Sequence, residues 1–66
     1  MKHYLFSEEI SGEQFIVGED NFEDAAMAAE GIAEAIGKDW NDGEWELKFL
    51  FEMSEEEAEA SGLDEY

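Results

Sequence analysis

The chain has 66 residues, enough for one small domain, and carries 20 Asp and Glu against three Lys and no Arg, for a formal net charge of −17. DNA and RNA binding depends on Lys and Arg that neutralise phosphates, so this composition excludes a direct nucleic-acid binder and disfavours an anionic membrane surface. Hydrophobic residues make up 44%, which is enough for a core, and the absence of Cys removes disulfides and thiolate metal sites.

The sequence shows no targeting signal. No stretch approaches the roughly 20 apolar residues of a membrane-spanning helix. The apolar run within residues 1–10 is too short for a signal peptide, and acidic residues follow it at once. Together with the absence of Cys, these features predict a cytoplasmic protein.

The first two elements are predicted to be strands joined by a tight turn. Alternating runs begin at Lys2 and again over about residues 13–18. Ser11-Gly12 suits a two-residue turn between them, because glycine tolerates positive φ. This turn would set Phe6 opposite Val17. The side chains expected to line one face together are Tyr4, Phe6, Phe15 and Val17.

A helix is predicted from about Phe22 to Ile36. Asn21 has the character of an N-cap, and Asp24 stands at the reciprocal position of a capping box. Gly37 is placed to end the helix, and Lys38 suits the negative end of its dipole. The apolar positions recur at steps of three and four and form one stripe, made of Phe22, Ala25, Ala26, Ala29, Ile32, Ala33 and Ile36.

The third strand has the clearest pattern in the sequence and spans Trp45 to Met53. Its odd-numbered residues are all apolar, whereas its even-numbered residues are charged apart from Leu50. After it, Ser54 opens a capping-box pattern that predicts a short helix to about Ala60. Gly62 would end that helix, and the last residues are expected to fray.

These elements predict an α+β fold with two layers and the order β-β-α-β. The three strands are expected to form an antiparallel sheet in the order 2-1-3, with the amphipathic helix packed on one face and a short, marginal C-terminal helix. Residues 1–53 would form the single domain, and residues 54–66 an acidic C-terminal segment with a short helix and a frayed end.

A second apolar group is expected on the sheet face that the main helix leaves open. Leu5, Ile16 and Leu50 all point to that face. Three interpretations stay open. The C-terminal segment folds back over the group through Leu63 and Tyr66, the group is a homodimer or partner interface, or it is simply exposed.

The loop after the main helix holds two candidate features. Trp40 either caps the end of the core or anchors a partner, because exposed Trp is favoured at binding hot spots. The neighbouring acids superficially resemble a calcium loop. An EF-hand starting at Asp39 would place Gly43 at position 5 and Leu50 at position 12, whereas Gly is needed at 6 and Glu at 12. We therefore predict no metal site.

No catalytic machinery is predicted. His3 is the only histidine and is expected to be a surface residue near the end of the chain, without the nucleophile and orienting group that a general base needs. Paired carboxylates are unavoidable among 20 acids, but glycosidase-type chemistry requires two of them in a partly dry cleft. A domain of this size has little room for such a cleft, so we predict neither an enzyme nor a cofactor.

The acidic surface is the remaining candidate for function. Its charges are spaced along the helix and the last strand at separations comparable to those of phosphates along DNA. A rigid body of this kind would be steered towards a basic target. The residues predicted to carry this surface are Glu23, Glu30, Glu34, Glu44, Glu46, Glu52, Glu55, Glu56 and Glu57.

Two functions stay open on this evidence. The first is a small, acidic, non-enzymatic protein-interaction module, in its narrower form a nucleic-acid mimic that inhibits a basic, nucleic-acid-binding protein partner. The alternative is a homodimeric structural domain whose acidity serves solubility only.

The start of the helix, Asp20-Asn21-Phe22-Glu23-Asp24-Ala25, together with the two strands before it, resembles the small partial double-stranded-RNA-binding-like domains of antitoxin proteins. This resemblance covers about half of the chain and carries no residue role across. In size and acidity the chain also resembles the small accessory proteins of bacteriophages, including nucleic-acid mimics. That resemblance implies a phage or bacterial setting and a protein partner.

Overall fold

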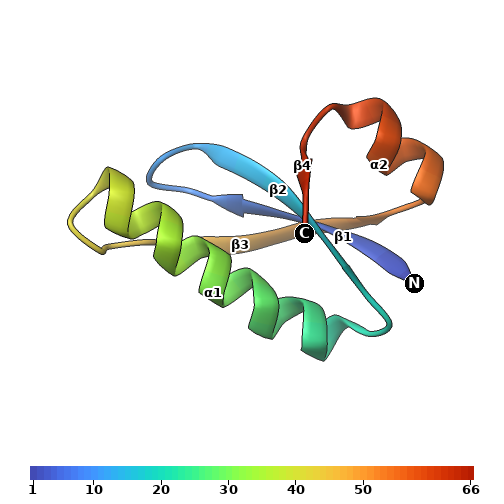
Figure 1. Ribbon diagram of the computed structural model, residues 1–66, viewed down its shortest axis with the longest axis horizontal. Helices are drawn as coiled ribbons and strands as arrows, with labels where there is room; N and C mark the ends of the chain where they lie inside the picture. The colour runs from blue at the N-terminus through green and yellow to red at the C-terminus, as the bar shows by residue number, and fades with distance from the viewer.

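Four strands and two helices make up the chain in a computed structural model that describes residues 1–66. In chain order they are β1 (Lys2–Glu8), β2 (Glu13–Glu19), α1 (Phe22–Trp40), β3 (Leu47–Met53), α2 (Glu55–Ser61) and β4 (Asp64–Glu65). The strands form one sheet in the order β3-β1-β2-β4, in which β1 is antiparallel to β2 and β3, and β2 is parallel to β4 (Figure 1). The α+β class is confirmed. The predicted sheet of three antiparallel strands is wrong in count and type, because the end of the chain returns to the edge of β2.

The β1–β2 hairpin has a longer loop than the sequence predicted. Phe6 lies opposite Phe15 and Glu8 lies opposite Glu13, so four residues rather than two connect the strands. The predicted pairing of Phe6 with Val17 is therefore wrong by two positions. Because side chains alternate with a period of two, this shift leaves every side chain on its predicted face.

The hairpin loop is held by the carboxylate of Glu8, which is fully buried, at 0% exposure. One carboxylate oxygen accepts hydrogen bonds from the backbone N–H of Ile10 at 3.0 Å and of Glu46 at 2.8 Å, and the other accepts from Ser11 at 2.7 Å. Burial alone would raise the pKa of Glu8, but the hydrogen bonds from Glu46, Ser11 and Ile10 together lower it from 4.5 to about 2. This one side chain joins the hairpin loop to the segment that enters β3.

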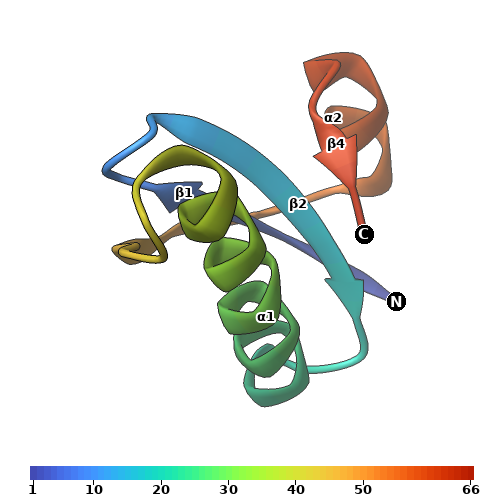
Figure 2. The same ribbon diagram turned by 60° about the vertical axis from the view of Figure 1, so that its left-hand side comes forward.

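The first core lies between α1 and one face of the sheet. Figure 2 shows α1 running along this face. Four side chains from β1 and β2 pack there against Ala25 and Ala29, which are completely buried. Alanine has no bulk beyond Cβ, so the helix axis can approach the aromatic rings closely. The four strand residues are Tyr4, Phe6, Phe15 and Val17, as predicted.

α1 begins as predicted and ends one turn later. The Asn21 side chain accepts the backbone N–H of Asp24 at 2.9 Å, which confirms the N-cap. Gly37 does not end the helix. It is buried inside it, and a Cβ there would overlap the carbonyl oxygen of Glu44. The helix ends at Trp40, and the C-cap residue Asn41 donates its N–H to the Gly37 carbonyl at 2.8 Å. Glycine is needed here because the returning loop crosses the helix at this point.

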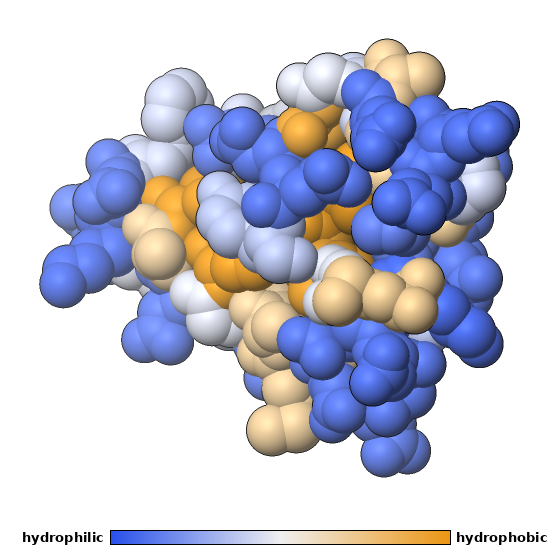
Figure 3. Space-filling view, turned by 45° about the vertical axis from the view of Figure 1, so that its right-hand side comes forward, coloured by the Kyte–Doolittle hydropathy of each residue, from blue (hydrophilic) through white to orange (hydrophobic).

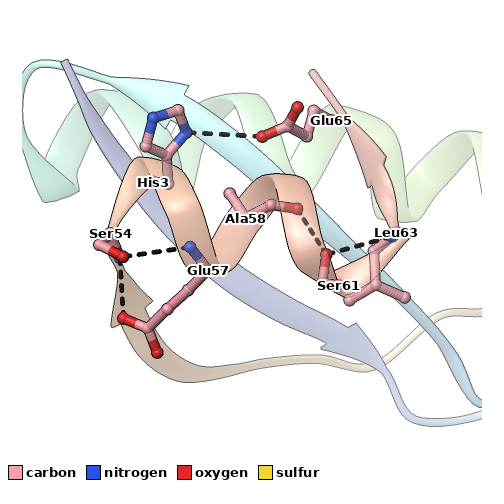
Figure 4. Close-up of polar contacts among 7 residues, drawn as sticks. All are labelled: His3, Ser54, Glu57, Ala58, Ser61, Leu63 and Glu65. Atoms are coloured by element: carbon pink, nitrogen blue, oxygen red, sulfur yellow. Dashed lines mark hydrogen bonds and ion pairs between the residues drawn. The ribbon is translucent and has the colours of Figure 1, made fainter.

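A second, smaller core lies on the opposite face of the sheet, beneath α2. Ser54 and Glu57 form the predicted capping box, and Gly62 ends the helix in the left-handed region at φ 72° (Figure 4). Beyond it, β4 pairs with β2, although the sequence had suggested a frayed end. The C-terminal segment thus covers the apolar group, as the first of the three interpretations had it, through Leu63 but not through Tyr66, whose ring packs against Phe15 of the first core. The residues of this core are Leu5, Ile16 and Ala58, with Leu50, Met53 and Leu63 packed against them.

β3 departs from its predicted alternation at a bulge. Phe49 lies opposite Phe6, and Phe51 lies opposite Leu5, so Leu50 is an extra residue between them. Up to Phe49 the odd-numbered residues face α1, but from Phe51 onward they share a face with Leu5. The odd-numbered apolar residues of the predicted strand therefore do not all lie under α1, as an unbroken alternation would require. Phe49 remains 39% exposed and Phe51 50% exposed.

Replacing Glu8 by Gln should lower the free energy of unfolding at pH 7 by on the order of 2 kcal/mol, because an amide cannot accept all three N–H groups and its own donors lack partners. The folded-state pKa is depressed, so this stabilisation is complete above pH 4.5 and is lost as the pH falls towards about 2, where the folded chain also takes up the proton. Urea denaturation of both proteins across this range measures the difference.

The matched control for this experiment is Glu9→Gln. Glu9 is exposed, and its side chain should change the free energy of unfolding by less than about 0.5 kcal/mol. A wild-type to Glu8→Gln difference that stayed constant down to pH 2 would contradict the role assigned to the carboxylate.

Two glycines of α1 should respond oppositely to replacement by Ala. Gly31→Ala should stabilise the protein by up to about 1 kcal/mol, because nothing lies within 4 Å of the added Cβ and Ala favours the helix. Gly37→Ala should destabilise it, because the added Cβ would meet the Glu44 carbonyl and lie 3.0 Å from the Cβ of Trp45. Melting temperatures decide the matter, and equal shifts in one direction would refute the close approach at Gly37.

Candidate protein-interaction surface

Nearly all of the negative charge lies on the surface. Of the 20 acidic residues, Glu8 is buried and Glu19 is half-buried, and the other eighteen are exposed. Figure 3 shows one face of the molecule, on which hydrophilic side chains stand in groups around smaller apolar areas. The shell of carboxylates that the sequence predicted is therefore present, and it is interrupted by apolar surface.

The protein does not neutralise this charge internally. Only one carboxylate lies within 4.0 Å of a side chain that can carry positive charge. It belongs to Glu65 and lies 3.7 Å from Nδ1 of His3, a contact that is an ion pair only when the imidazole is protonated (Figure 4). The three lysines are exposed, and none of them lies within 4.0 Å of a carboxylate. The negative field of the surface is therefore available to a partner.

The predicted acidic residues are all exposed, but they do not form one continuous row. Glu23, Glu30 and Glu34 lie on α1, where no side-chain hydrogen bond engages them. On β3, the bulge at Leu50 places Glu52 opposite Tyr4, so Glu52 does not share one face with Glu44 and Glu46, as the even-numbered spacing of these acids would suggest.

Three of these acids also have local structural roles. Glu57 accepts the backbone N–H of Ser54 at 3.2 Å in the capping box, and Glu44 accepts the side-chain amide of Asn41 at 3.3 Å. The N–H of Glu46 donates to Glu8, while its own carboxylate is exposed. Substitutions of Glu44 and Glu57 would mix effects on the fold with effects on binding, whereas the Glu46 hydrogen bond comes from its backbone and survives a side-chain substitution. The α1 residues are therefore the cleaner probes of charge.

The predicted apolar interface is largely covered. Leu5 and Ile16 are buried beneath α2, and Leu50 is half-buried against them. The α2 helix therefore removes this group from the surface in the single chain. Trp40 is instead the last residue of α1 and is 65% exposed, so it does not cap the core.

Two features of the surface were missed by sequence reasoning. One is the exposed aromatic pair Phe49 and Phe51 on β3, and the other is the burial of Glu8. The run Phe49-Leu50-Phe51 carried a signal, because three consecutive apolar residues cannot share one face of a strand. The sequence also held a signal for the burial of Glu8, because the alternation of the strand places this residue on the same face as Tyr4 and Phe6.

One shallow hollow of about 220 Å³ lies between β2, α1 and the C-terminal residues. Its walls include the carboxylates of Glu13 and Asp64 and the rings of Phe15 and Tyr66. No three metal-ligating side chains lie close enough to hold an ion. Neither helix combines the length and the apolar character needed to cross a membrane.

No protein-family model, curated protein or solved structure matches this chain. The resemblance to antitoxin domains and to phage accessory proteins therefore stays a prediction. Arguments about function rest on the surface itself.

Unneutralised charge at this density should make stability depend on salt. The melting temperature should rise as salt increases from near zero to about 0.15 M, because screening weakens the repulsion among the exposed carboxylates. The triple variant Glu23→Gln, Glu30→Gln and Glu34→Gln removes three of these charges and should show a smaller rise. Calorimetry of both proteins tests this, and a wild-type melting temperature that falls with salt would contradict it.

Proposed function

We propose that this chain is a non-enzymatic protein-interaction module whose partner is a protein with a basic surface. The observation that carries the proposal is the exposure of eighteen carboxylates with no lysine beside any of them. A charge of this size opposes folding of a small domain, so a bound cationic surface would stabilise the chain as well as bind it. Most of the exposed acids also stand on helices and strands, although Glu44 and Glu46 lie in the loop before β3, and this placement reduces the entropy lost on binding.

The charge density supports the narrower form of the proposal, a nucleic-acid mimic. The longest extent of the fold is 34 Å, so its net charge of −17 corresponds to one charge per 2 Å. Double-stranded DNA carries one charge per about 1.7 Å of its axis. A basic groove that binds nucleic acid would therefore meet a similar amount of negative charge over a similar length. We propose such a nucleic-acid-binding protein as the partner, inhibited by competition.

The alternative, a homodimeric domain whose acidity serves solubility only, has less support. Its predicted contact face was Leu5, Ile16 and Leu50, and α2 occupies that face. Two copies would also bring together two surfaces of the same strong charge, which disfavours association.

The proposal is tested by capture on the immobilised chain from an extract of the native host. The captured protein should be basic and should bind nucleic acid by itself, and its affinity should fall steeply between about 50 and 200 mM salt. Double-stranded DNA should displace the chain from it. Capture of neutral or acidic proteins only would refute the proposal, and a basic partner that DNA does not displace would refute the mimic.

A pair of α1 variants separates charge from shape. Glu23→Gln, Glu30→Gln and Glu34→Gln together should weaken binding by about tenfold, at roughly 0.5 kcal/mol for each exposed charge. The control, Met27→Gln with Ala35→Gln, changes exposed positions of the same helix and keeps the charge. Equal affinities of the two variants would show that the α1 carboxylates do not contact the partner.

A further inference from the structure

The outer edge of β3 is open along its whole length. β3 has seven residues, lies at the end of the sheet and pairs with β1 alone. None of the backbone hydrogen bonds made outside the helices and strands involves a residue from Leu47 to Met53. An edge strand of this length presents a row of free N–H and C=O groups that another extended chain can pair with.

The opposite edge of the sheet is closed in a way that β3 is not. There, β4 pairs with β2, and Gly18 and Tyr66 extend the contact, with the Gly18 N–H donating to the Tyr66 carbonyl at 2.8 Å. The α2 helix leads directly into this cover. The fold therefore leaves only the two-residue strand β4 at one edge and the seven-residue strand β3 at the other.

Aromatic side chains flank the open edge on both faces of the sheet. Phe49 lies on the α1 side with its ring centroid 4.9 Å from that of Phe22, and both rings are partly exposed. Phe51 lies beyond the bulge, at the register position of Leu5 on the α2 side. The side chains of an added strand would point alternately to the two faces of the sheet, and each face offers them an aromatic contact.

Charge selects the occupant of this edge. Glu46 precedes β3, Glu52 lies within it and Glu55 begins the acidic first turn of α2, while Lys48 is the one cation of the strand. A second copy of the chain would bring the same acids against these and add its own net charge of −17. An extended segment that alternates basic and apolar residues fits both the carboxylates and the rings.

We propose that the outer edge of β3 is the docking site for an extended, basic segment of the partner protein, which adds to the sheet as a fifth strand. This inference rests on the proposed function and specifies where contact is made. Backbone hydrogen bonds would supply the part of the affinity that does not depend on the side chains of the segment. Phe49 and Phe51 would select apolar side chains, and the neighbouring acids would select the basic ones.

The test uses a synthetic peptide, Lys-Val-Lys-Val-Lys-Phe-Lys-Val-Lys, titrated into the intact chain and followed by NMR. The β3 amides that are unpaired in the free chain should become protected from hydrogen exchange. Two versions of this peptide carry N-methyl groups on alternate residues, one on the odd-numbered and one on the even-numbered positions. Each keeps the charge but loses the N–H donors of one edge, and the version whose methylated edge faces β3 should bind at least roughly tenfold more weakly. Equal binding of the two methylation patterns and the parent peptide overturns the inference.

Matched variants test the side-chain contribution. Phe51→Ser should weaken peptide binding by about tenfold, whereas Met27→Ser, at a 72% exposed position on α1, should change it by less than about twofold. Equal effects of the two substitutions would overturn the role of Phe51. The methylated peptides need no variant, so the edge itself is tested even if Phe51→Ser perturbs the fold.

The outcomes separate this inference from the function on which it rests. Salt-sensitive capture of a basic host protein, with β3 amides that stay unprotected in that complex, overturns the docking site and leaves the proposed function standing. Absence of any salt-sensitive basic partner refutes both. Protection of the β3 amides in the free chain, together with a dimer in sedimentation, would assign the edge to a second copy and overturn the inference.

Discussion

Two small apolar cores on opposite faces of β1 have to hold the chain together against the repulsion of its own carboxylates. β1 is the central strand in this arrangement, because residues from Tyr4 to Glu8 are all buried, with Tyr4 and Phe6 in one core and Leu5 in the other. α1 closes one face and α2 the other. Neither helix could be lost without exposing one of the two cores that offset a net charge of −17.

Glu8 shows that the same residue type can serve both the surface and the interior. Eighteen other acids are hydrated, whereas this carboxylate exchanges water for three backbone N–H groups. Those donors come from the hairpin loop and from Glu46 just before β3, and Glu46 is 38 residues from Glu8 in the chain. The buried charge therefore fixes the loop and the entry to β3 relative to each other. Its cost of burial is offset by the donors it satisfies.

Patterns in the sequence correctly predicted the features that depend on neighbouring residues, and failed for the features that depend on contacts between distant segments. The cap at Asn21, the capping box at Ser54 and the faces of β1 and β2 depend on neighbours in the chain, and they were predicted. The bulge at Leu50 and the strand β4 depend on contacts with β1 and β2. The exposed carboxylates needed only composition, whereas the open edge of β3 needed the strand order. No local pattern encodes which strand lies at an edge.

The acidic shell and the open edge of β3 are best understood together. An exposed edge with aromatic side chains invites pairing with identical chains, and proteins limit this with charges, bulges or short strands. Here the bulge at Leu50 shortens each regular stretch of β3, and the net charge of −17 opposes the approach of identical copies. The same negative charge repels any acidic chain and attracts a basic one. In the proposed function, a single property of the sequence would therefore both oppose self-association and select a basic partner, which would let the edge stay open without a covering strand.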